Sequence, residues 1–89
     1  MSRFIAGKVY QLIYHGGGDR MIFIIMEDKQ LEILHDSAKD EYNWTGLLGH
    51  YDDDKIYVPK DSIMINCRNI KKLSIKRDEI DDYLMLENI

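Results

Sequence analysis

The residues best suited to ligand chemistry are aromatic, and most of them lie in one segment, residues 36–55. Tyr42, Trp44 and Tyr51 belong to that segment, and Tyr57 follows it closely. Their large π-faces can stack on a nucleobase or another planar ring, and each stacked base contributes about 1–3 kcal/mol. The same side chains could instead cover the hydrophobic core, and both interpretations stay open. The ligand-binding site predicted here comprises Tyr42, Trp44, His50, Tyr51 and Tyr57, with Arg20, Lys55 and Lys60 near strand ends to neutralise phosphates.

Three histidines and one cysteine are the other candidates for catalysis or metal binding. His15, His35 and His50 have neither the spacing of a helical i, i+4 metal pair nor that of a zinc motif. The single Cys67 excludes an intrachain disulfide and a zinc site built from several cysteines. Its alternation with Ile65 predicts a buried thiol. No Ser–His–Asp or Cys–His arrangement is evident, so we expect a protein that is not an enzyme and holds no metal or cofactor.

The run Gly16-Gly17-Gly18-Asp19 separates two apolar stretches near the N-terminus. A phosphate-binding loop needs a helix N-terminus, or a lysine with a serine or threonine, after its glycines, whereas a strand pattern follows here. Glycine reaches positive φ without steric cost, so the run can reverse the chain tightly. β-branched and aromatic residues are frequent in residues 7–15 and 20–26 on either side. The pattern predicts a β-hairpin.

The predicted hairpin is apolar on both of its faces. Met21, Phe23 and Ile25 would point one way, and Ile22, Ile24 and Met26 the other. An antiparallel sheet usually keeps one wet face, so the second apolar face needs a cover. The C-terminal helix, a closed sheet or another subunit could provide it. We favour a homo-oligomer formed through the apolar hairpin, because a chain of 89 residues has little length to spare.

The remaining chain alternates strand patterns with turns and ends in a helix. Further strands are predicted at residues 30–35, 55–58, 63–67 and 72–76, with a long aromatic and acidic loop at residues 36–55. Residues 78–88 predict the C-terminal helix, capped by Asp78. Its Ile80, Tyr83 and Leu84 form a stripe suited to packing on the sheet.

Together these elements predict one small, mainly β domain over residues 1–89. We expect a five- or six-stranded antiparallel sheet or a small SH3/Sm-like barrel with a short C-terminal helix. The resemblance to such barrels is one of strand count and size. No apolar run reaches the ~18 residues of a membrane span, and no signal-peptide pattern follows Met1. We therefore expect a cytoplasmic protein without membrane contact.

Charge and composition narrow the class of partner. The chain has 12 basic and 16 acidic residues and a net charge of −4. A basic excess is typical of proteins that bind duplex DNA or RNA, so a duplex partner is disfavoured. Alanine is scarce and lysines outnumber arginines, a composition common in AT-rich bacteria and their phages.

Three functions fit these observations. The leading hypothesis is an oligomeric, non-catalytic accessory protein of a phage or mobile element. It would evade host immunity by sequestering a small nucleotide signal such as a cyclic dinucleotide. The alternative is a protein–protein inhibitor that presents an acidic surface to a host nucleic-acid-binding protein, with Asp36, Asp40, Glu41 and residues 52–54 as that surface. A small barrel that binds single-stranded RNA is the third hypothesis.

Overall fold

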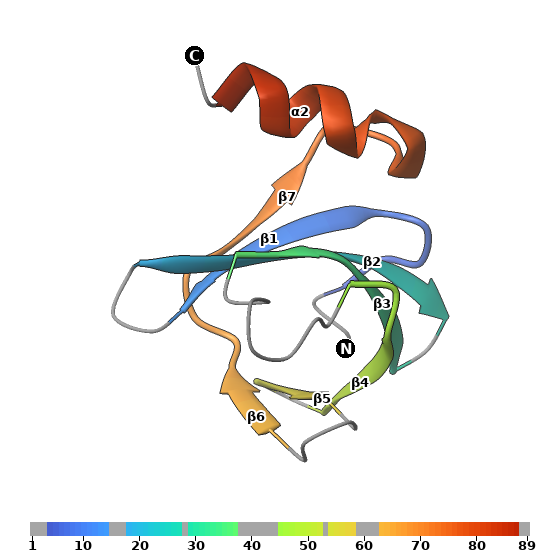
Figure 1. Ribbon diagram of the computed structural model, residues 1–89. Coiled ribbons are helices and arrows are strands. Elements are labelled where there is room, and N and C mark those ends of the chain that lie inside the picture. The colour runs from blue at the N-terminus through green and yellow to red at the C-terminus, as the bar shows by residue number, and fades with distance from the viewer. Residues whose placement is uncertain are drawn as a thin grey trace.

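The fold is a curled antiparallel sheet with one helix packed on its outside (Figure 1). The computed structural model describes residues 4–14, 18–27, 29–37, 45–52, 54–58 and 63–87. In these residues the sheet has the strand order β6-β5-β4-β3-β2-β1-β7, and all neighbouring strands are antiparallel. The elements are β1 (Val9–Tyr14), β2 (Asp19–Glu27), β3 (Gln30–Asp36), β4 (Leu48–Asp52), β5 (Lys55–Val58), β6 (Ile63–Asn66), β7 (Ile70–Leu73), the 3-10 turn η3 (Arg77–Glu79) and α2 (Ile80–Glu87).

The mainly β class is confirmed, but the described parts of the chain form seven strands rather than five or six. The extra strand, β4, lies inside the segment predicted as a loop at residues 36–55, and Asp36 itself ends β3. Buried and exposed residues alternate along β4, but one of the two buried positions is Gly49. Because glycine has no side chain, the sequence does not show the alternation of apolar and polar residues that is typical of a strand. A Cβ at Gly49 would lie 2.7 Å from the carbonyl oxygen of Tyr57, so only glycine lets β4 and β5 approach this closely.

The other strand boundaries follow the sequence pattern closely. β1, β2 and β3 coincide with the predicted strands except at their ends, and β5 occupies the predicted residues 55–58. The hairpin is confirmed by the pairing of β1 with β2, which runs from Val9 opposite Ile24 to Tyr14 opposite Asp19. The last strand lies at Ile70–Leu73 rather than at residues 72–76, after a left-handed residue at Asn69 (φ 55°). Residues 15–17 at the hairpin tip lie outside the described residues.

The main hydrophobic core fills the inside of the curl. Alternate residues of the hairpin point into it, among them Tyr10 and Leu12 from β1 and Met21 and Phe23 from β2. Phe4 closes this core from the N-terminal side and makes edge-to-face contacts with the rings of Tyr10, Phe23 and Tyr51. Edge-to-face aromatic pairs contribute about 0.5–1.5 kcal/mol beyond the area that they bury.

A second, smaller core lies between the outer side of the hairpin and α2. Val9 and Ile22 are fully buried there, and the predicted stripe of Ile80, Tyr83 and Leu84 packs against them. α2 covers most of the hairpin face that does not point into the curl (Figure 1). Ile24 is half-buried beside this core, and Met26, which was predicted to share the face, is 46 % exposed. The chain's own helix is therefore the main cover of this face, and a homo-oligomer through the hairpin stays a prediction.

The C-terminal helix begins near its predicted start. The 3-10 turn η3 occupies Arg77–Glu79 and α2 continues to Glu87, whereas Asn88 lies outside the described residues. The residue before the turn is Lys76 rather than the predicted cap Asp78, and the Lys76 N–H donates a hydrogen bond to Oε1 of Glu79 at 2.8 Å. Within the residues that the structure describes, no helix has the length and apolarity needed to cross a membrane.

Candidate binding surface

Three of the predicted site residues meet on the outer side of β4, β5 and β6, away from the main core. Side chains alternate across a strand, so the inward Tyr51 and Ile56 leave His50, Tyr57 and Lys55 on the outer side. We call this side the outer face. His50 lies opposite Gln30 of β3 and opposite Tyr57 of β5, and Tyr57 lies opposite Met64 of β6. One row of side chains therefore crosses four strands.

The centre of the outer face is a pair of stacked rings. The centroids of His50 and Tyr57 lie 4.8 Å apart, and their planes differ by 13°. His50 is exposed and Tyr57 is half-buried. Cross-strand aromatic pairs contribute roughly 0.2–1 kcal/mol to a sheet, so the pair holds its rings in a defined orientation while part of their surface stays open to solvent.

Two exposed apolar side chains flank the stacked pair. Leu48, two residues before His50 on β4, is 59 % exposed, and Met64, opposite Tyr57, is 50 % exposed. Large apolar side chains grouped at a surface mark a place where a ligand or a partner binds more often than single ones do. Neither Leu48 nor Met64 was among the site residues predicted from the sequence. The signal for Leu48 was the alternation of residues 48–52, which becomes visible only when Gly49 is counted as an inward residue.

The described charges beside the stacked pair are those of one lysine and two aspartates. Lys55 lies on the same side of β5 as Tyr57, and its backbone neighbours across the sheet are Asp52 and Asn66. Asp52 and Asp54 are exposed. Among the described residues of the outer face, Lys55 is therefore the cation that could meet a phosphate, and it lies beside carboxylates that would repel a highly charged anion.

Two predicted site residues lie away from the outer face. Tyr51 is 6 % exposed, and its ring contacts Phe4 in the main core at 4.8 Å between centroids. Arg20 lies on β2 near the hairpin tip, where its Nη1 donates to Oε1 of Gln11 at 3.4 Å. Oε1 of Gln11 also accepts from the hydroxyl of Tyr83, so Arg20 belongs to a polar group beneath α2. Tyr42, Trp44 and Lys60 lie outside the described residues.

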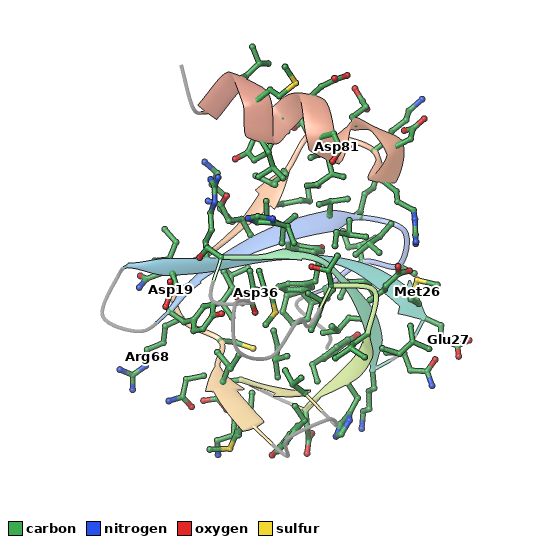
Figure 2. The ribbon with its side chains drawn as sticks, in the orientation of Figure 1. Asp19, Met26, Glu27, Asp36, Arg68 and Asp81 are labelled. Atoms are coloured by element: carbon green, nitrogen blue, oxygen red, sulfur yellow. The ribbon has the colours of Figure 1, made fainter. Side chains whose placement is uncertain are left out.

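A buried acidic group lies inside the curl. Asp36 is fully buried and accepts a hydrogen bond from the hydroxyl of Tyr14. Figure 2 shows Asp36 below the sheet within the curl, whereas Arg68 extends outward. Burial, followed by the bond to Asp36 and its charge, raises the pKa of Tyr14 well above the ordinary value. Asp36 is thus not part of the acidic surface predicted from the sequence, because its side chain is buried and accepts a hydrogen bond inside the protein.

The described residues contain no group of three or more histidine, cysteine or acidic side chains placed to hold a metal ion. Cys67 is buried, as its alternation with Ile65 predicted. Comparison with family models, with curated proteins and with solved structures finds no match to this chain.

Proposed function

We propose that this protein is a non-catalytic binding protein and that the outer face of β4, β5 and β6 binds the base of a small nucleotide. The observation that supports this proposal is the exposed stack of His50 on Tyr57. Proteins that bind unpaired bases use aromatic side chains on an open sheet as stacking platforms. Leu48 and Met64 would extend the contact to the edges of a base, and Lys55 would meet one phosphate.

The balance of charge on the outer face favours a small ligand over a long strand. Binding along a nucleic-acid backbone requires several cations in a groove, whereas Lys55 stands here between Asp52 and Asn66. A cyclic dinucleotide, with two phosphates and two bases, is the ligand that we would test first. Sequestration of such a signal suits the immune-evasion role proposed for an accessory protein of a phage or mobile element.

Calorimetric titration with mononucleotides and cyclic dinucleotides tests the proposal. Tyr57→Ala should weaken binding about tenfold, the equivalent of one stacked ring, and His50→Ala by a similar factor. Lys55→Gln should weaken binding of a nucleotide but not of its nucleoside, whereas Lys72→Gln, an exposed lysine on β7, serves as the matched control. Absence of binding at ligand concentrations of about 1 mM, or unchanged affinity in both aromatic variants, would contradict the proposal.

A protein partner is the second candidate, and the exposure of Leu48 and Met64 favours it. Methionine and tyrosine are enriched at protein interfaces, and the neighbouring Asp52 and Asp54 suit a basic partner such as a nucleic-acid-binding protein. A partner captured from nuclease-treated host lysate should be lost with Leu48→Glu and retained with Leu86→Glu, since Leu86 is exposed on α2. Equal capture by both variants would exclude the outer face. A gel-shift with short oligonucleotides tests the single-stranded RNA alternative.

A further inference from the structure

The sheet is open, and its two edge strands differ in chemistry. β6 forms one edge and β7 the other, at opposite margins of the curl (Figure 1). β7 carries the exposed Lys71 and Lys72, and charged side chains of this kind prevent an edge strand from pairing with another chain. β6 has the sequence Ile-Met-Ile-Asn and carries no charge or proline. The β6 edge therefore lacks the protection that the β7 edge has.

The pairing of β6 with β5 determines which backbone groups of β6 point to the free edge. The N–H of Cys67 donates to the carbonyl of Asp54, which makes these two residues a hydrogen-bonded pair of the antiparallel ladder. Such pairs alternate along a ladder with pairs that make no bonds. Ile65 lies opposite Ile56, and Met64 lies opposite Tyr57. The backbone groups of Ile65 therefore form hydrogen bonds with β5, whereas those of Met64 do not. The N–H and C=O of Met64 point away from β5, to the free edge.

One more backbone group at this edge has a partner within the chain. The carbonyl of Asn66 accepts from the N–H of Arg68 at 2.9 Å. Among the described residues, the free edge of β6 thus presents the N–H of Asn66 and both backbone groups of Met64. A donor and an acceptor on one residue are the requirement for a reciprocal pair of bonds with an identical residue.

We propose that β6 pairs antiparallel with β6 of a second copy of this chain, about a twofold axis at Met64. The N–H of each Met64 donates to the C=O of the other, and the two sheets become continuous. An uncharged strand can pair with its own copy without repulsion, whereas pairing through β7 would bring lysines close to lysines. This is a different surface from the hairpin, which packs on the main core with one face and mostly on α2 with the other.

The pairing would also join the two outer faces. The row of Gln30, His50, Tyr57 and Met64 would continue across the axis into the same row of the second copy. The two half-exposed Met64 side chains would become cross-strand neighbours at the centre. The proposal concerns self-association alone and does not depend on nucleotide binding, which is measured separately.

Sedimentation equilibrium over a range of protein concentration tests the pairing. A short edge gives a small interface, so we expect the mass to rise from 10.5 kDa toward twice that value between about 10 μM and 1 mM. Met64→Pro removes the outward N–H, which an edge strand tolerates, and should keep the mass at 10.5 kDa throughout. Met64→Lys provides a second test if the proline variant does not fold, because it places like charges opposite each other at the axis.

The matched control is Leu86→Lys, which adds the same charge at an exposed apolar position on α2. It should associate as the wild-type chain does, and thermal melts should show that all three variants are folded. A wild-type mass of 10.5 kDa at every concentration would overturn the proposal. Association of the folded Met64 variants equal to that of wild type, or its loss in Leu86→Lys alone, would also overturn it.

Discussion

Glu32 on β3 and Arg77 in η3 form a two-pronged ion pair although they lie 45 positions apart in the sequence. Nη1 and Nη2 of the guanidinium each donate to a separate carboxylate oxygen, and the Nη2···Oε2 distance is 2.5 Å. The bonds to Glu32, followed by its charge, raise the pKa of Arg77 above the ordinary value. The pair fixes the start of the C-terminal helix over β3, and from there α2 runs across the hairpin (Figure 1).

Removal of this ion pair should loosen α2 more than it destabilises the sheet. Arg77→Gln should speed hydrogen exchange of the α2 amides by no more than about fivefold, because a pair whose guanidinium is 52 % exposed contributes little in water. The effect should shrink as salt is added, since mobile ions screen exposed charges. Exchange measured by mass spectrometry, with Lys72→Gln as control, checks this. An equal change in β1 and β2 would mean that the pair supports the whole fold.

The contact between the hairpin and α2 should carry a large share of stability. Ile22→Ala removes a fully buried side chain between β2 and α2 and should lower the free energy of unfolding by about 2–5 kcal/mol. Met85→Ala, on the exposed side of α2, should change it by less than about 0.5 kcal/mol. Urea titrations followed by circular dichroism give both values. Similar values for the two variants would mean that α2 does not cover Ile22.

Gly49 should be required for the outer face as well as for stability. A Cβ at this position would meet the Tyr57 carbonyl at 2.7 Å, so β4 and β5 must separate in Gly49→Ala. We expect a loss of about 1–3 kcal/mol in the free energy of unfolding, the usual cost of overpacking. The separation should also disturb the His50–Tyr57 stack, which NMR detects as a change in the ring-current shifts of the two rings. Unchanged shifts would show that β4 and β5 accommodate the added methyl group without moving the two rings.

The burial of the Tyr14 hydroxyl, together with its bond to Asp36, should make the protein sensitive to alkali. The pKa of Tyr14 is raised in the folded state, so above the unfolded value of about 10 the unfolded chain holds fewer protons than the folded one. The free energy of unfolding is therefore fully retained below about pH 10 and falls as the pH rises further.

Tyr14→Phe tests both the contribution of this tyrosine to stability at neutral pH and its contribution to the loss of stability in alkali. Loss of one donor to the buried carboxylate should lower stability at neutral pH by about 1–3 kcal/mol, and the alkaline decline should become shallower. Urea titrations between about pH 7 and pH 11 measure both quantities, with Tyr83→Phe as the control. An alkaline slope equal to that of wild type would assign the decline to another group.

The amino-acid pattern alone predicts which hairpin residues share a face. Side chains alternate along a strand whatever its surroundings, so Met21, Phe23 and Ile25 separate from Ile22 and Ile24 in the fold as in the pattern. The apolar stripe of α2 could also be predicted from the sequence, because helical spacing alone places Ile80, Tyr83 and Leu84 on one side.

Contacts between segments far apart in the chain determine what covers the outer side of the hairpin and which aromatic residues meet. The cover is α2, more than fifty positions after β2, and local sequence carries no record of a contact at that distance. The status of β4 as a strand depends on the fit of Gly49 against β5. Once β4 is a strand, the neighbours His50 and Tyr51 must point to opposite sides, so one reaches the outer face and the other the core.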